Sequence, residues 1–112
     1  MIIRKVNDVP AEPVTEPGAA QVTRRILLSP CEAAPNFTMR RFEVAPGGFT
    51  MFHQHNYEHE IYILSGRGKV RRKDSEIEIA PHDAILVLPN EEHQFINIGD
   101  EPLVFLCLIP NI

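Results

Sequence analysis

Hydrophobic residues in this chain occur in short runs that polar and turn-forming residues separate. Runs of this length, rich in β-branched and aromatic residues, predict strands. Each run is bounded by Pro, Gly, Asn or Asp, which are typical of turns. No segment has a convincing helical period. Strands are therefore expected at residues 24–29, 36–45, 49–55, 59–66, 68–74, 75–80, 84–89, 93–99 and 103–110.

Many short strands at this spacing predict an all-β domain, whose sheet curls or closes into a sandwich, jelly roll or barrel. The chain has 112 residues, which is the length of one domain. Its segment "PAEPVTEPGAA" (10–20) has the composition of an arm or linker. We therefore expect an N-terminal strand and extended arm at residues 1–22 and a barrel domain at residues 23–112.

Composition narrows the function classes. Hydrophobic residues make up 44% and charged residues 23%, and the net charge is -4. Without a basic excess, neither nucleic acid nor an anionic membrane is expected as a partner. No run reaches the ~18 apolar residues of a membrane span, so a soluble, cytoplasmic protein is expected. Cys31 and Cys107 lack metal or redox spacing, and we expect both to be reduced and Cys107 to be buried.

The segment "HQHNYEHEIYILSG" (53–66) carries the most distinctive chemistry. It places His53, His55 and His59 within seven positions, and His93 stands apart from them. Alternation puts 53 and 55 on one side, and 59, 61 and 63 on one face of the next strand. Because imidazole is the commonest protein ligand for first-row transition metals, the spacing predicts a metal site. Surface or structural histidines are the alternative.

The same segment resembles the first motif of the cupin family, G-x5-H-x-H-x3-E-x6-G. The matching positions are Gly47, His53, His55, His59 and Gly66, with histidine where the family usually has glutamate. The second cupin motif, G-x5-P-x-G-x2-H-x3-N, is similar to "HDAILVLPNEEHQFIN". Its positions are held by His82, Leu88, Asn90, His93 and Asn97. Asn suits a turn that needs positive φ, and His82 is expected on an exposed turn.

The resemblance covers about residues 34–110 and is to small single-domain bacterial cupins that hold manganese with four histidines. It implies a jelly-roll barrel, a homodimer and one divalent metal ion per chain. The implied ligands are His53, His55, His59 and His93. The resemblance points to manganese, whereas the Irving–Williams order for imidazole ligands favours iron, copper, nickel or zinc.

Histidine replaces the glutamate of the family motif, so the bound ion keeps its full +2 charge and has no carboxylate ligand. Glu58 and Glu60 alternate out of phase with His59, so they are expected to face away. The predicted substrate pocket consists of Arg40, Phe95, Phe105 and Cys107. Ordinary core packing is the alternative for Phe95, Phe105 and Cys107. Arg40 enters it only if its face of the strand is the inner one, where it could orient a carboxylate; a surface position is the alternative.

Two function hypotheses from different classes follow. The first is a metal-dependent oxidoreductase of dioxygenase type, acting on a small organic substrate with dioxygen or peroxide. The second is a non-enzymatic module in which the metal holds a small ligand or supports the fold. Isomerase or epimerase chemistry is less favoured because no proton-abstracting base is evident beside the metal. The pattern assigns no catalytic residue.

Overall fold

The computed structural model describes residues 1–111 and is built almost entirely of strands. No α-helix occurs among these residues, which confirms the all-β prediction. The elements are the 3-10 helices η1 (Val6–Asp8) and η2 (Pro30–Glu32) and the strands β1 (Glu12–Pro13), β2 (Ala20–Leu28), β3 (Phe37–Phe49), β4 (His59–Ser65), β5 (Gly68–Arg71), β6 (Glu76–Ile79), β7 (Ala84–Val87), β8 (Gln94–Asn97) and β9 (Leu103–Pro110).

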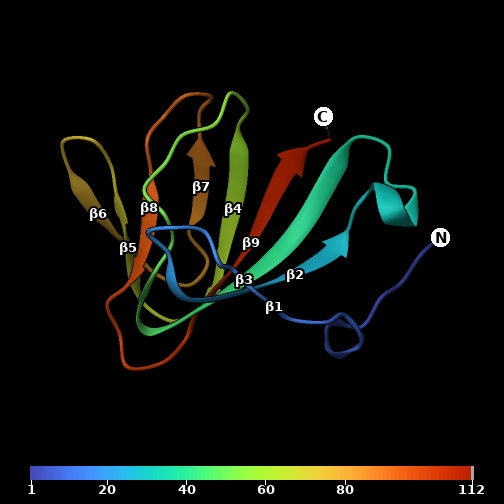
Figure 1. The fold of residues 1–112 in the computed structure, drawn as a ribbon, viewed down its shortest axis with the longest axis horizontal. Coiled ribbons are helices and arrows are strands. Elements are labelled where there is room, and N and C mark those ends of the chain that lie inside the picture. Colours follow the sequence, from blue (N-terminus) through green and yellow to red (C-terminus); the bar gives the residue numbers. More distant parts are fainter. Residues whose placement is uncertain (112) are drawn as a thin grey trace.

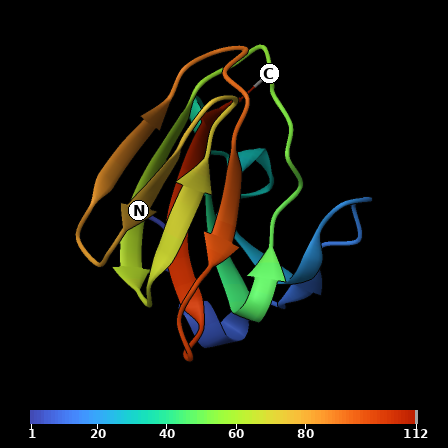
Figure 2. The same ribbon diagram turned by 90° about the vertical axis from the view of Figure 1, so that its left-hand side faces the viewer.

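The strands form one antiparallel sheet that curls on itself (Figures 1 and 2). Its order is β6-β5-β8-β3-β9-β4-β7, and β2 with β1 adds to β3. The long strand β3 pairs with β2 and β9, and its last residue Phe49 pairs with Ile96 of β8. Gly47, just before this junction, has a φ of +81°, a conformation that glycine adopts without strain. The curled sheet is the jelly-roll architecture expected from the sequence.

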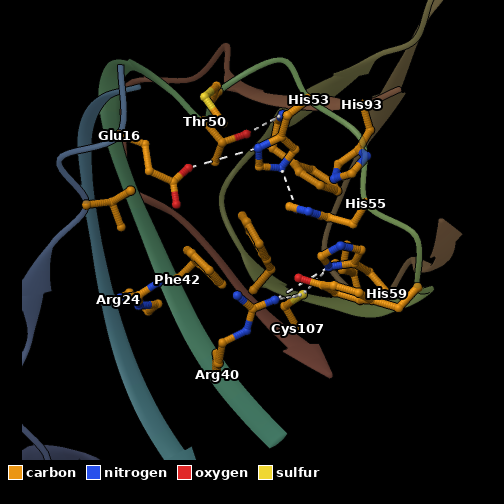
Figure 3. Close-up of a pocket in the computed structure, with 16 residues that line it drawn as sticks. Glu16, Arg24, Arg40, Phe42, Thr50, His53, His55, His59, His93 and Cys107 are labelled. Atoms are coloured by element: carbon orange, nitrogen blue, oxygen red, sulfur yellow. Dashed lines mark hydrogen bonds and ion pairs between the residues drawn. The ribbon is translucent and has the colours of Figure 1, made fainter. Parts of the chain in front are cut away.

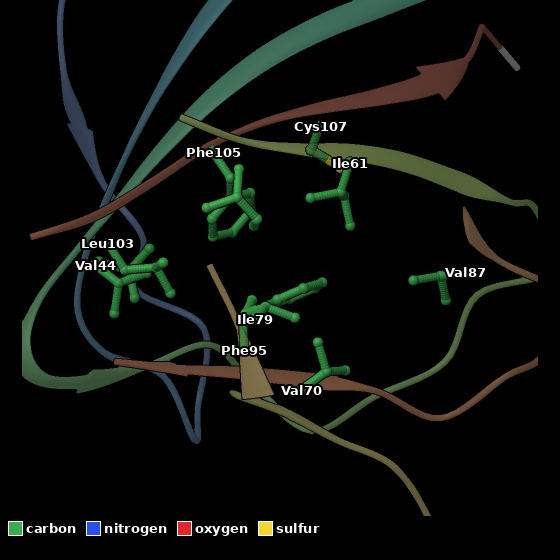
Figure 4. Packing of buried hydrophobic residues seen from close by; sticks show 11 residues of the cluster. Val44, Ile61, Val70, Ile79, Val87, Phe95, Leu103, Phe105 and Cys107 are labelled. Carbon is green, nitrogen blue, oxygen red and sulfur yellow. The ribbon is translucent and has the colours of Figure 1, made fainter. Parts of the chain in front are cut away.

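The core fills the inside of the curl (Figure 4). Phe105, Ile63, Leu103 and Val44 are its largest fully buried side chains. In β4, burial alternates strictly from His59 to Ile63, so positions 59, 61 and 63 share the inner face, as the sequence predicted. His59 therefore points into the barrel from the start of β4.

The predicted strand at residues 49–55 does not form as an element of its own. Phe49 ends β3, and the following residues are irregular apart from a single bridge between His53 and His93. Thr50 explains the change, because both its backbone N–H and its hydroxyl bond to the backbone of Phe95 and leave no regular ladder. This loop, residues 50–58, nevertheless runs beside β8 and carries two of the candidate ligands.

The N-terminal segment lies along the barrel. β1 is its strand and pairs with β2, with Glu12 opposite Arg24, while residues 1–5 form no strand. β2 already begins at Ala20, ahead of the boundary expected at residue 22. Because Val14 donates its N–H to Val22 O at 2.9 Å, the chain beyond β1 is held against the sheet. The arm consequently reaches the mouth of a pocket.

The turns of the second motif have the conformation expected of their glycine positions. His82 has a φ of 76° and Asn90 a φ of 65°. His82 is exposed, as predicted, and its Nδ1 lies 3.0 Å from Tyr62 Oη on the outer surface. Among residues 1–111, no helix has the length and apolarity needed to cross a membrane.

Candidate metal centre

Four histidines line one end of a pocket inside the barrel (Figure 3). His53 and His55 come from the loop 50–58, His59 begins β4 and His93 precedes β8. Two backbone hydrogen bonds fix the loop to β8: the N–H of His53 donates to His93 O at 3.2 Å, and the N–H of His93 donates to His53 O at 2.9 Å. The fold thus brings together side chains up to 40 positions apart in the sequence.

Three of the four imidazoles converge closely, and the fourth lies beside them. One ring nitrogen from each of His53, His55 and His93 lies within 4.8 Å of the others, and the Nε2 atoms of His53 and His55 are 3.2 Å apart. His59 lies outside this group of three, although its ring centroid is 5.0 Å from that of His55 and 5.1 Å from that of His93. A three-histidine cluster with a fourth ring beside it is the observed arrangement.

In two of the rings, one nitrogen already has a partner. His93 Nδ1 lies 2.9 Å from the backbone oxygen of Glu91, which requires an N–H at that position and leaves Nε2 as a lone-pair donor. His59 Nδ1 lies 3.3 Å from Cys107 Sγ, while its Nε2 is buried without a hydrogen-bond partner. Since buried polar atoms are rarely unpaired, this orphaned nitrogen fits a metal ligand.

The site favours neutral imidazoles. Burial, followed by repulsion from neighbouring cationic groups, lowers the pKa of His53 to about 4 and that of His59 to about 3. Burial also lowers the pKa of His55 and His93. Because only the unprotonated ring can donate to a metal, the histidines are in the ligating form at neutral pH.

Three phenylalanine rings form one wall of the pocket. Phe42 and Phe105 stack with ring centroids 5.3 Å apart, and Phe95 lies 4.9 Å from Phe105. The cavity has a volume of about 210 Å³. All four residues predicted for the substrate pocket, namely Arg40, Phe95, Phe105 and Cys107, line this cavity. Their contact with a substrate remains a prediction.

Arg40 lies on the inner face of β3. Its Nη2 donates to Cys107 Sγ at 3.0 Å and lies 3.5 Å from His59 Nδ1. Burial raises the pKa of the Cys107 thiol, and the Arg40 guanidinium opposes this shift in part. Cys107 is buried, as predicted, and Cys31 is exposed and also free. Arg40, Cys107 and His59 therefore form one contact chain between β3, β9 and β4.

Two charged residues at the pocket were missed by the sequence analysis. Glu16 comes from the arm, and its Oε2 lies 4.0 Å from His53 Nδ1. Arg24 reaches the pocket from β2. Neither carries a motif signal, because the arm resembled a linker and Arg24 is one of two adjacent arginines whose orientation depends on strand pairing. Glu58 and Glu60 are exposed, in line with their predicted orientation.

Comparison with known proteins places this arrangement in a family. A family model described as a cupin domain matches residues 40–109, which is more than half of the chain. The chain therefore belongs to the cupin family.

Solved structures agree with this assignment. A polyketide cyclase from Streptomyces resistomycificus is 37% identical, with a TM-score of 0.92 over 98% of this chain and 79% of that one. A predicted oxalate decarboxylase from Thermotoga maritima is 25% identical, with a TM-score of 0.86 over 99% of this chain and 100% of that one. These relatives carry enzymatic names of different reaction types, so the likeness alone does not select one.

A curated relative carries a third activity. The 1-methylthio-D-xylulose 5-phosphate methylsulfurylase of Rhodospirillum rubrum is 35% identical over 88 residues, which is 79% of this chain. The matched region is 55% of the length of that protein, so this chain spans about half of it.

Proposed function

We propose that this cupin is a metal-dependent enzyme that acts on a small organic substrate. The observation that carries the proposal is the convergence of His53, His55 and His93, with the unpartnered Nε2 of His59 beside them, at the end of an aromatic-walled cavity. A divalent ion held by these four residues would supply Lewis acidity toward a substrate oxygen. The resemblance supports manganese, and imidazole ligands are equally compatible with iron, copper, nickel or zinc.

The protein residues would divide the remaining work. Phe95 and Phe105 limit the access of bulk water to the histidine end of the cavity. Glu16 is the carboxylate among the residues that line the pocket, and it stands beside His53. In this proposal, Glu16 accepts or returns a substrate proton.

Two reaction types fit this site. An oxidoreductase of dioxygenase type, using dioxygen or peroxide, is supported by the apolar wall beside the histidines, which would protect a reactive oxygen species from water. Ring closure without an oxidant is supported by Glu16 as a base and by the likeness to a polyketide cyclase. Ring closure therefore has the support of two independent observations.

One experiment separates these reactions from simple binding. The metal-loaded protein is incubated with a panel of small keto and phenolic compounds, in air and without oxygen, and products are identified by mass spectrometry. A dioxygenase consumes oxygen and yields a product with two added oxygen atoms. A cyclase forms the same product under both conditions, with a mass equal to that of the substrate or lower by one water. Saturable binding of compounds that are never converted would contradict an enzyme and favour the non-enzymatic module.

We also propose the homodimer and the cytoplasmic location that the sequence suggested. Tyr62, Leu64 and Leu86 form exposed apolar surface on the outer side of β4 and β7, which supports an association through this face. Light scattering coupled to gel filtration should give twice the mass of one chain. A monomer mass at micromolar concentration would contradict the dimer.

A further inference from the structure

Two arginines give the pocket a charge opposite to that of the whole protein. Apart from the histidines, the charged residues that line it are Arg24, Arg40 and Glu16. These lining residues therefore carry one net positive charge, with Glu12 beside Arg24 outside the lining, and a divalent ion would add two more charges, in a chain whose net charge is -4. A positive cavity in a negative protein attracts small anions.

The Arg40 guanidinium is incompletely satisfied by the protein. Its Nη2 donates to Cys107 Sγ, but its Nε is buried without a partner. No salt bridge among residues 1–111 involves it. The face of the guanidinium is 5.0 Å from the centroid of Phe42, which fixes its position against the aromatic wall. Arg40 thus keeps donor capacity for a ligand.

Arg24, on the neighbouring strand β2, also keeps hydrogen-bond donors that the protein does not satisfy. Its Nε is also buried without a hydrogen-bond partner. Its Nη2 lies 3.8 Å from Glu12 Oε2, too far for a hydrogen bond, and the Glu12 side chain is 55% exposed. Arg24 stands opposite Phe42 in the β2–β3 register, so its side chain is on the same face of the sheet as the ring that Arg40 contacts. Figure 3 places them on the side of the pocket away from His53 and His93.

We infer that the substrate carries an oxyanion group, which the Arg24 and Arg40 guanidiniums bind, while its reacting oxygen faces the histidines. This inference rests on the proposed function and adds the substrate class to it. Carboxylate and phosphate are the groups that guanidinium recognises with paired N–H donors. The stacked rings of Phe42 and Phe105, with Phe95 tilted against Phe105, favour a flat, apolar body between the two ends. The class is a small aromatic or unsaturated acid or phosphate ester.

The test measures binding, so it does not depend on turnover. Benzoate, phenyl phosphate and the neutral analogue benzamide are titrated by calorimetry into the metal-loaded protein and into protein treated with EDTA. Benzoate or phenyl phosphate should bind at least tenfold more tightly than benzamide. The tighter of the two anions identifies carboxylate or phosphate as the preferred group. Equal affinity for benzoate, phenyl phosphate and benzamide would overturn the inference.

Matched variants locate the binding to the two arginines. Arg24→Gln and Arg40→Gln should each weaken anion binding by about tenfold or more, because each removes a charged donor. The controls are Arg25→Gln and Arg41→Gln, which remove the same charge one residue away. Arg25 bonds to Val6 O and Arg41 pairs with Glu43, both outside the pocket, so anion affinity should be unchanged. Equal weakening in variants and controls would mean that net charge alone attracts the anion, which contradicts a site.

The same data separate this inference from the proposed function. Arginine-dependent binding of benzoate to a protein that retains no metal would preserve the oxyanion site and contradict the metal enzyme. Metal retention with no preference for anions would preserve the metal enzyme and contradict the oxyanion site. Arg40→Gln can affect folding because Arg40 holds Cys107; in that case Arg24→Gln, whose parent side chain is 28% exposed, carries the test alone.

Discussion

The histidine end of the pocket and its aromatic wall are held in place by different kinds of structure. Three of the four histidines lie outside the regular strands, where the His53–His93 bridge and backbone hydrogen bonds between Thr50 and Phe95 and between Asn90 and His55 hold the chain. The wall comes from the long β3–β9 ladder, in which Phe42 is opposite Phe105 and Arg40 is opposite Cys107. A change at the histidine end should therefore alter metal binding with little effect on folding, and a change in the packed rings of the wall should mainly lower stability.

The largest expected effect on ligand binding is the loss of metal when a clustered histidine is removed. His93→Ala deletes one of the three converging donors, and at least a tenfold drop in metal affinity is expected with the fold retained. Equilibrium dialysis followed by elemental analysis measures it, and circular dichroism checks the fold. His82→Ala is the control, because His82 contacts Tyr62 on the surface. Metal loss in His82→Ala with retention in His93→Ala would show that the motif has been misaligned.

Truncation of the wall should give the largest loss of stability. Phe105 is 2% exposed and packs on both Phe42 and Phe95, so Phe105→Ala should lower the free energy of unfolding by about 3–5 kcal/mol. Urea denaturation of the metal-free protein measures this value. Phe37→Ala, at a position 63% exposed, should cost about 0.5 kcal/mol or less. Similar losses in both variants would contradict the assignment of Phe105 to a packed wall.

These two regions were also unequally predictable from the sequence. Alternation correctly placed His59, Ile61 and Ile63 on one inner face, because β4 is a regular strand with one buried side. The same rule predicted a strand at residues 49–55, where Thr50 replaces the ladder with side-chain and backbone bonds to Phe95. The alternation of hydrophobic and polar residues does not reveal where a side chain competes with the backbone for hydrogen bonds.

Residues from the arm and from β2 lay beyond sequence reasoning for a different reason. Glu16 sits in a Pro- and Gly-rich segment that reads as a linker, yet β1 pairing and the Val14–Val22 hydrogen bond hold it over the pocket. Whether Arg24 or Arg25 faces inward depends on the register of β2 against β3, including its bulges. Long-range pairing of this kind leaves no short motif.

An exchange at the junction of the two regions should have an intermediate effect. His59→Glu restores the usual cupin residue, and its carboxylate would lie near the Arg40 guanidinium, which is now 3.5 Å from His59 Nδ1. Metal should be retained, and the reduction potential of a redox-active ion such as iron should fall because the ligand is anionic. Electrochemical titration measures the change. An unchanged potential with unchanged metal content would mean that residue 59 is not a ligand.

The smallest effect is expected from removal of the Cys107 thiol, which lies between the histidine end and the aromatic wall. Cys107→Ala removes the sulfur that accepts from Arg40 and contacts His59, and it leaves a small void, so stability should fall by roughly 1–2 kcal/mol while metal content stays the same. Cys31→Ala, at an exposed cysteine, is the matched control and should change neither quantity. Loss of metal in Cys107→Ala would indicate that the thiol holds His59 in place for binding.

Metal stoichiometry tests the central claim most directly. Protein purified from its own host, and protein reconstituted separately with manganese, iron, copper, nickel and zinc, would be dialysed and analysed for metal. We predict one tightly held ion per chain, and loss of that ion when His53, His55 and His93 are replaced together by alanine. A chain that retains no ion under any of these conditions, or a triple variant that retains it fully, would contradict the claim that the converging histidines form a metal centre.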